Sequence, residues 1–206
     1  MDGLLFDSER IVQRSWEIAG DELGIPHMWD VIYHTLGMNR AGRNEYFRKY
    51  IREDFPFEEF GKLTRDNFWK IVDKEGLPLK KGAKELLAYG KSQGYKMAVA
   101  TSSSREYAMG NLIRAGIDSY FDSVVCGDMV KKAKPDPEIY IYTMKKMGVE
   151  PKDCYVVEDS TFGLQAAESA GAVVICKRDD RFGYDQSGAD YYIDRLAEIE
   201  DICLGK

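Results

Sequence analysis

The run CYVVEDSTFGLQAAESAGAVVIC, residues 154–176, holds the pattern that decides the fold. Its two ends, residues 154–159 and 172–176, are short apolar runs typical of buried strands. The residues between them have the character of a helix, with Asp159 or Ser160 as the cap at its start. Strands that follow one another through a helix pair in parallel, because a parallel pair needs a crossover connection. The stretch therefore predicts a strand, a helix and a parallel strand.

The same texture extends through the C-terminal two thirds of the chain. Further strand candidates and amphipathic helices alternate there, the strands at 95–101, 122–127 and 190–194 and the helices at, for example, 83–92 and 138–147. This alternation predicts an α/β fold with a doubly wound parallel sheet and helices on both faces. In such sheets ligands bind beyond the carboxyl ends of the strands.

The N-terminal third has a different character. Before Gly76 no alternating strand pattern occurs, and four segments have helical character: 29–36, 43–51, 57–72 and a first helix that Ser8 would cap and Gly24 would follow. We expect two domains, an all-helical one at residues 8–75 and an α/β one at residues 1–7 and 76–206.

Composition limits the function classes. The 206 residues are 44% hydrophobic with a formal net charge of −6, and the longest basic cluster is the short KKAK at 131–134. We therefore expect neither a nucleic-acid nor a membrane partner. The four cysteines form no C-x-x-C pair, which favours reduced thiols and a cytoplasmic protein. We expect a monomer.

Paired acids follow one predicted strand. A cap on the next helix explains one of Glu158 and Asp159 but not both. Two adjacent carboxylates after a buried strand repel each other and are costly to desolvate unless a hard cation lies between them. The pair therefore indicates a metal site.

Hydroxyl and lysine side chains stand at other strand ends. Thr101 to Ser104 follow the strand at 95–101, where they can cap the next helix or, with Ser102 among them, form a phosphate seat. In KAKPDPE, the segment from Pro135 is a helix start, which leaves Lys134 as either a solvated lysine or a directed cation. Together these groups describe a site for phosphate and Mg²⁺, which prefers carboxylate, phosphate and water oxygens.

The motifs and their order resemble the haloacid dehalogenase superfamily of phosphohydrolases, in the branch with β-phosphoglucomutase and sugar-phosphate phosphatases. Those proteins have DxDGxxxDS after their first strand and then an inserted helical cap. This chain has MDGLLFDSE, a helical block, VATSSS, KAKPDP and VVEDSTFGLQAAESAGA, so the resemblance covers nearly its whole length. It implies a Rossmann-like core and Mg²⁺-dependent phosphoryl transfer through an aspartyl-phosphate intermediate.

The resemblance also implies roles for five residues. Asp2 matches the general acid and base whose backbone carbonyl ligates Mg²⁺. Thr101 matches the phosphate-binding hydroxyl, and Lys134 matches the lysine that neutralises the phosphate. Glu158 and Asp159 match the metal-binding acids.

The nucleophile of the family would stand two positions before Asp2, ahead of Met1, together with the first, central strand of the sheet. We expect either a native start upstream or a non-catalytic relative, and little activity from the 206 residues alone. Without that strand the sheet is expected to have a gap with unpaired edges.

The helical block matches the cap that selects substrates. TLGMNRAGR, residues 35–43, resembles its specificity loop and makes Arg40 a candidate substrate contact, with a solvated arginine as the alternative.

Mutases of the branch carry a histidine where this chain has Val12, which favours a phosphatase of small phosphorylated metabolites. A phosphomutase and an inactive phosphate-binding module stay open as alternatives. A receiver domain of response regulators shares the strand-end chemistry but is shorter and lacks the helical block.

Overall fold

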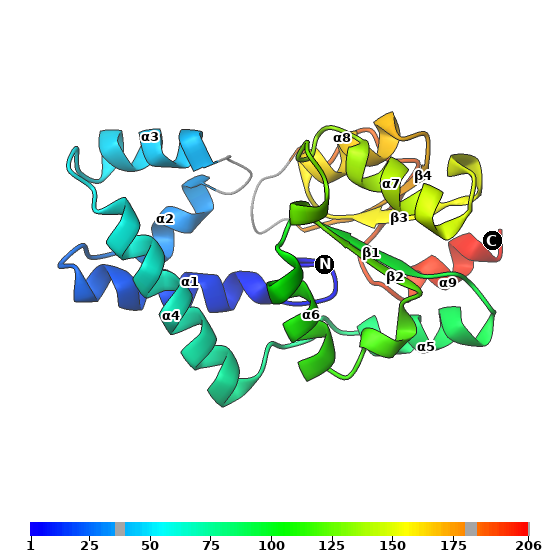
Figure 1. Cartoon of the computed structure of the whole chain (residues 1–206), viewed down its shortest axis with the longest axis horizontal. Helices are drawn as coiled ribbons and strands as arrows, with labels where there is room; N and C mark the ends of the chain where they lie inside the picture. The colour runs from blue at the N-terminus through cyan, green and yellow to red at the C-terminus, as the bar shows by residue number, and fades with distance from the viewer. Residues whose placement is uncertain (36–39, 180–184, 206) are drawn as a thin grey trace. The chain divides into compact units, whose positions relative to one another are not determined.

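The chain forms two compact units in a computed structural model that describes residues 1–35, 40–179 and 185–205 (Figure 1). One unit comprises Met1–Phe6 with Pro78–Lys206, and the other comprises Asp7–Leu77. The first is the α/β part of the chain and the second is helical. No helix among the described residues is long and apolar enough to cross a membrane.

The α/β unit alternates strands and helices as the sequence predicts. Its elements are α5 (Ala83–Ser92), β1 (Ala98–Thr101), α6 (Arg105–Arg114), η1 (Asp118–Tyr120), β2 (Ser123–Cys126), η2 (Gly127–Met129), α7 (Glu138–Met147), η3 (Pro151–Asp153), β3 (Tyr155–Glu158), α8 (Thr161–Ser169), β4 (Val173–Lys177), β5 (Tyr191–Ile193) and α9 (Glu198–Cys203). Strand β1 begins at Ala98, three residues later than predicted. The Met97 amide just before it donates to the Asp122 side-chain carboxylate at 2.9 Å, and not to a strand carbonyl.

All strand pairs are parallel, but the strands form two separate sheets. One sheet holds β1 and β2, with Thr101 opposite Cys126, and the other holds β3, β4 and β5, with Glu158 opposite Cys176. Within the residues that the structure describes, β1 pairs only with β2, and β3 pairs only with β4. The expected break in the sheet is therefore present between β1 and β3.

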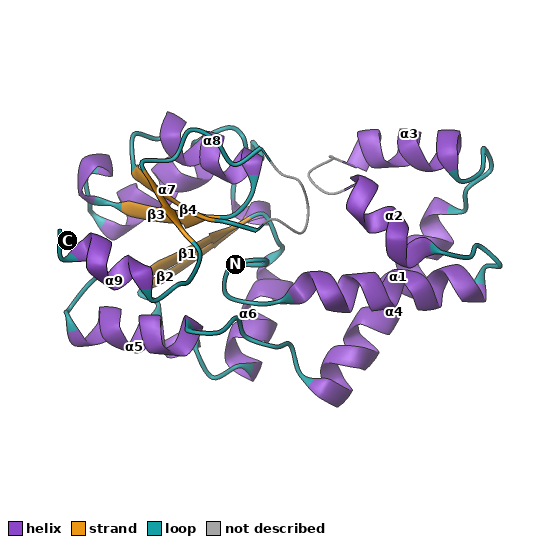
Figure 2. Ribbon diagram, turned by 180° about the vertical axis from the view of Figure 1, so that it is seen from behind, coloured by secondary structure: helices purple, strands orange, loops and turns teal. Residues whose placement is uncertain are grey.

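Helices cover both faces of these strands, as a doubly wound fold requires (Figure 2). Helix α7 packs against β1 and β2 and helix α8 against β3 and β4, while α5, α6 and α9 lie on the opposite side of the strands. The core under α7 and α8 includes Val125, Ile139, Leu164 and Val174. Burial of these aliphatic side chains fixes the strands that carry the polar residues described below.

The helical unit consists of α1 (Ser8–Glu22), α2 (Met28–Thr35), α3 (Arg40–Tyr50) and α4 (Phe57–Glu75). Its core is aromatic: the Trp16 ring meets the rings of Phe47 and Phe60 edge to face, each at 5.6 Å between centroids. Helix α4 continues three residues past its predicted end, and its last residue, Glu75, accepts two hydrogen bonds from Arg14, at 2.6 and 2.8 Å.

The predicted cap at Ser8 is wrong. Ser8 is buried and is already the first helical residue of α1, so its hydroxyl stands one position too late to cap the helix. Asp7 stands at the cap position but makes no side-chain cap hydrogen bond. Its carboxylate instead lies 3.3 Å from the Arg10 guanidinium in the first turn.

Candidate active site

Lys134 links the carboxyl ends of β1 and β3. Its ammonium donates to the Ala100 carbonyl of β1 at 3.3 Å and lies 2.5 Å from Oε1 of Glu158, the last residue of β3. The side chain is only 10% exposed, so the alternative of a solvated surface lysine is wrong. The peptide bond that follows, Lys134 to Pro135, is cis. A directed cation therefore stands where two strands of the fold end.

Glu158 is a buried, ionised carboxylate. It accepts from Lys134 and from the Tyr140 hydroxyl through Oε1, and from the Asp159 amide and the Ser160 hydroxyl, both at 3.3 Å, through Oε2. Burial alone would raise the pKa of Glu158, but the charges of the Lys134 and Met1 ammonium groups and the hydrogen bonds from Lys134 and Tyr140 lower that pKa from 4.5 to about 2. Glu158 is therefore charged at neutral pH.

The start of α8 is shaped around this carboxylate. A Cβ atom at Gly163 would overlap the Glu158 carboxylate, so only glycine fits in this first turn. Ser160 caps the helix by accepting from the Gly163 amide at 3.2 Å. The predicted cap is thus Ser160, and Asp159 is left for another role. Asp159 is half-buried, and its carbonyl accepts from the Gln186 amide group at 2.6 Å.

The loop after β1 presents hydroxyl groups and backbone amides. Thr101 is buried and accepts from the Ser103 amide at 3.2 Å, while Ser104 caps α6 by accepting from the Tyr107 amide at 3.4 Å. Ser102 is exposed, and its carbonyl lies so close to Gly127 that a Cβ there would overlap it. The helix-cap prediction is confirmed for Ser104.

Asp2 is held by the same loop and helix. The Ser103 hydroxyl donates to its Oδ2 at 2.9 Å, and the Tyr107 hydroxyl donates to its Oδ1 at 3.0 Å. Both carboxylate oxygens are therefore oriented by neutral donors. Ser103 belongs to the predicted hydroxyl-rich loop, but Tyr107 was not anticipated from sequence.

Tyr140 is a second residue that the sequence did not single out. It lies on the buried face of α7, donates to Glu158 and receives a hydrogen bond from the Lys134 ammonium at 2.8 Å. Burial and the nearby Glu158 charge hold the pKa of Tyr140 well above its usual range. A tyrosine on an apolar helix face needs a partner for its hydroxyl, which is the signal that could have identified it.

Arg40 is the first residue of α3, in the helical unit, and its side chain lies outside the described residues. So do residues 36–39 of the predicted specificity loop. The structure thus assembles Lys134, Tyr140 and Glu158 into one cluster and Asp2 with the loop after β1 into another, while the placement of Arg40 at a substrate stays a prediction.

Glu158 and Asp159 are the candidate ligands for Mg²⁺. Among the described residues no three His, Cys, Asp or Glu side chains gather closely enough to hold a metal ion. Magnesium sites commonly use only one or two carboxylates and complete their shell with phosphate and water. An ionised Glu158 next to Asp159 fits that requirement, although in this structure the Lys134 ammonium donates to Glu158.

A parallel, doubly wound core with an inserted helical unit, and with acids, hydroxyls and lysine at the strand ends, defines a phosphohydrolase fold of the haloacid dehalogenase type. The chain belongs to the haloacid dehalogenase-like hydrolase family, whose sequence model matches residues 1–177.

Individual relatives agree with this assignment. A phosphorylated carbohydrates phosphatase of Thermotoga maritima is 33% identical over 171 residues, which cover 83% of this chain and 79% of the relative. The structure of CbbY from Rhodobacter sphaeroides in complex with phosphate has a TM-score of 0.80 at 26% identity and covers 97% of this chain and 93% of its own. A β-phosphoglucomutase-like protein of Thermotoga maritima has a TM-score of 0.83 at 28% identity, covering 100% and 96%.

Proposed function

We propose that this site carries out Mg²⁺-dependent hydrolysis of small sugar phosphates or related phosphomonoesters. The observation that carries the proposal is the buried Lys134 ammonium between the ends of β1 and β3, next to an ionised Glu158. Relatives support the substrate class, since one is a phosphorylated carbohydrates phosphatase and another was crystallised with xylulose-1,5-bisphosphate.

Each polar group has a role in this proposal. Lys134 neutralises the negative charge of the bound phosphate, while the Thr101 hydroxyl and the exposed backbone at Ser102 donate to its oxygens. Asp2 gives a proton to the leaving alcohol and then takes one from the attacking water. The donors from Ser103 and Tyr107 hold the Asp2 carboxylate in one orientation for both transfers.

Glu158, Asp159 and the backbone carbonyl of Asp2 would hold Mg²⁺. When bound, the ion neutralises charge on the phosphate oxygens. Because Glu158 is ionised over the whole physiological range, its capacity to ligate a cation does not depend on pH there. Lys134 and Tyr140 keep its Oε1 in place from the other side.

The covalent step of the family needs a nucleophilic aspartate two positions before Asp2, and the 206 residues place only Met1 between their start and Asp2. A polypeptide of these 206 residues alone is therefore expected to hydrolyse phosphate esters slowly, by direct attack of water at the phosphate. A chain carrying Phe-Asp ahead of Met1 would form and hydrolyse the aspartyl phosphate, with Asp2 as the acid and then the base.

The helical unit selects the substrate in this proposal, with Arg40 as its contact. Arg40→Ala is expected to reduce kcat/KM for large esters more than for small ones, and a uniform loss across a panel of esters would contradict that role.

A phosphomutase is the second candidate function, favoured by the β-phosphoglucomutase-like relative and disfavoured by Val12 in place of the mutase histidine.

We also propose a monomer that acts in the cytoplasm on a small phosphorylated metabolite, without a nucleic-acid or membrane partner. The net charge of −6 supports the exclusion of nucleic acid as a partner.

A catalytically inactive phosphate-binding module is the alternative function of another class. Turnover by the chain that carries Phe-Asp separates an enzyme from such a module.

Titration of inorganic phosphate in the presence of Mg²⁺ tests the phosphate site itself. Thr101→Val keeps the shape of the side chain and removes the hydroxyl, and we expect it to weaken phosphate binding about tenfold. Lys134→Met is expected to weaken it further, since a charged donor is lost. Lys132→Met is the matched control, because Lys132 is 70% exposed and pairs with Asp136. Equal binding by parent, Thr101→Val and Lys134→Met would contradict the proposed site.

A further inference from the structure

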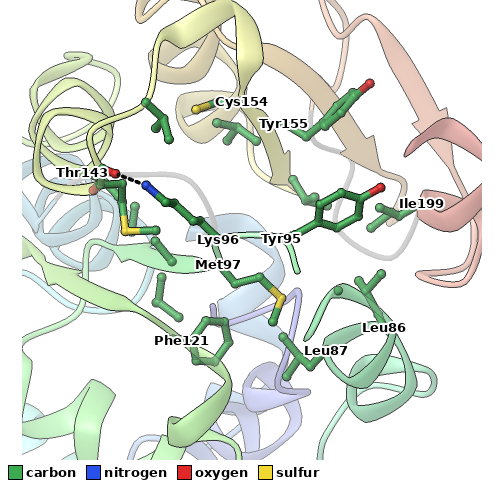
Figure 3. Close-up of a pocket in the computed structure, with 18 of the residues that line it drawn as sticks. Leu86, Leu87, Tyr95, Lys96, Met97, Phe121, Thr143, Cys154, Tyr155 and Ile199 are labelled. Atoms are coloured by element: carbon green, nitrogen blue, oxygen red, sulfur yellow. Dashed lines mark hydrogen bonds between the residues drawn. The ribbon is translucent and has the colours of Figure 1, made fainter. Parts of the chain in front are cut away.

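An apolar groove of about 610 Å³ lies at the break in the sheet, between β1 and β3 (Figure 3). Met97 and Ile199 are among the side chains that line it. Its charged lining residues stand at the strand ends, with Lys96 before β1, Asp153 before β3 and Glu158 at the end of β3. Charged groups are therefore found at the ends of the strands, and a second polar network lies at the carboxyl ends of β3 and β4.

Gln186 joins three backbone segments in this second network. Its Nε2 donates to the carbonyl of Asp159, directly after β3, at 2.6 Å and to the carbonyl of Lys177, the last residue of β4, at 3.3 Å. Its Oε1 accepts from the Asp179 amide at 3.2 Å. Both partners of Nε2 are acceptors and the partner of Oε1 is a donor, so only one orientation of the side-chain amide satisfies all three bonds.

Neighbouring contacts anchor the partners of Gln186. The carboxylate of Asp179 lies 3.5 Å from the Lys80 ammonium, and the two side chains are only 8% and 18% exposed. Asp185 directly precedes Gln186 in the chain, and its carbonyl accepts from the Thr161 hydroxyl, in the first turn of α8, at 2.7 Å. The segment that carries Gln186 is therefore attached to the start of α8, next to Asp159.

The bond from Gln186 completes the fixation of the Asp159 backbone. The Gly163 amide, four residues after Asp159, donates to the Ser160 hydroxyl at 3.2 Å instead of to the Asp159 carbonyl. That carbonyl is held by Gln186, while the Asp159 amide donates to the Glu158 carboxylate at 3.3 Å. Because peptide groups are planar, holding the groups on both sides of a residue sets its φ and ψ and thus the direction of its Cα–Cβ bond. Gln186 therefore helps to determine where the Asp159 carboxylate points.

We propose that Gln186 is a positioning residue for Asp159 as a ligand of Mg²⁺. The inference rests on the proposed function, in which Glu158 and Asp159 hold the ion. Lys134 and Tyr140 orient Glu158 through its carboxylate, whereas Gln186 orients Asp159 through its backbone. Removal of a group that orients a metal ligand typically weakens metal binding by about 10- to 100-fold.

Manganese binding by the 206-residue chain tests the proposal. Mn²⁺ prefers the same oxygen ligands as Mg²⁺, and its EPR signal in solution is lost when the ion binds. Gln186→Met keeps the length of the side chain and removes its three hydrogen bonds, so it should raise the dissociation constant for Mn²⁺ about tenfold or more. Gln93→Met is the matched control, because the Gln93 side chain is exposed and donates to the Ser92 hydroxyl, and it should leave this constant unchanged. Gln186→Asn, one methylene shorter, replaces Gln186→Met if circular dichroism shows that the latter does not fold.

Two further variants separate positioning from a general loss of structure. Thr161→Val removes the hydrogen bond to the Asp185 carbonyl and should lower Tm by about 2–4 °C without changing the dissociation constant for Mn²⁺. Asp159→Asn removes the charge of the ligand and should weaken Mn²⁺ binding at least as much as Gln186→Met does.

The outcomes distinguish the inference from the proposed function. Weaker binding by Asp159→Asn together with unchanged binding by Gln186→Met would overturn the inference and leave the metal site standing. Equal losses in Thr161→Val and Gln186→Met would also overturn the inference, because attachment of the segment would then account for the effect. Unchanged binding by Asp159→Asn, or no uptake of Mn²⁺ by the parent, would overturn the proposed metal role and the inference with it.

Discussion

Removal of the Lys134 ammonium should destabilise the fold as well as the site. In Lys134→Ala the buried Glu158 carboxylate loses the cation bonded to its Oε1, to which only the neutral Tyr140 hydroxyl then donates. Removing one partner of a buried ion pair typically costs about 3–5 kcal/mol, because the remaining charge is left uncompensated. A lysine that contacts only a bound phosphate would have no such effect on unfolding.

The pKa of Glu158 sets an upper magnitude, because the Met1 ammonium and the Tyr140 hydroxyl lower this pKa together with Lys134. The carboxyl titrates at about 2 in the folded protein and near 4.5 in the unfolded chain, a difference that corresponds to about 3 kcal/mol. Because the folded pKa is the lower one, this stability is present above pH 4.5 and is lost as the pH falls towards 2. The difference in the free energy of unfolding between the parent and Lys134→Ala should therefore become smaller as the pH falls from 4.5 towards 2.

Urea unfolding of the two proteins between pH 7 and pH 3 measures this difference. Lys132→Ala is the matched control, since its partner Asp136 lies at the surface and such pairs contribute about 1 kcal/mol or less. Adding Glu158→Gln to Lys134→Ala should recover part of the loss, because the unpaired charge is removed. The reasoning would be refuted if Lys134→Ala lost no more unfolding free energy than Lys132→Ala does. It would also be refuted if the loss were the same at pH 7 and pH 3.

Two further substitutions test the surroundings of the acids. Tyr107→Phe removes the 3.0 Å hydrogen bond to Asp2. In a chain carrying Phe-Asp ahead of Met1, this substitution should lower kcat about tenfold with little change in KM. An unchanged kcat would show that Tyr107 has no part in catalysis. Gly163→Ala forces a Cβ against the Glu158 carboxylate and should cost about 1–3 kcal/mol in urea unfolding. Gly110→Ala, where a Cβ meets nothing within 4 Å inside α6, should be neutral or stabilising, and equal effects of the two would contradict the steric argument.

The sequence was sufficient for the order of strands and helices, because short apolar runs and helical spacing are local properties. Helix α5 has the predicted bounds, and β2, β3 and β4 lie within one residue of theirs. The error at Ser8 arose because the cap position is defined by backbone angles and not by residue type.

The site was less accessible to sequence reasoning. Motifs marked Lys134 and Glu158 but not their mutual contact, which arises only when the ends of β1 and β3 meet. Tyr107 and Tyr140 reach the acids from helices more than 15 residues away in sequence, and no local pattern encodes such contacts. Side-chain partners of this kind follow from tertiary structure alone.

The most direct test of the central claim is hydrolysis of a panel of sugar phosphates with Mg²⁺ by three proteins in parallel. They are the 206-residue chain, the chain with an apolar strand ending in Phe-Asp placed before Met1, and the latter protein with Asp2→Asn. We predict Mg²⁺-dependent turnover by the second protein, at least about a thousandfold faster than by the first, and none by the third. Equal rates for the first two proteins, or full activity after Asp2→Asn, would contradict the account.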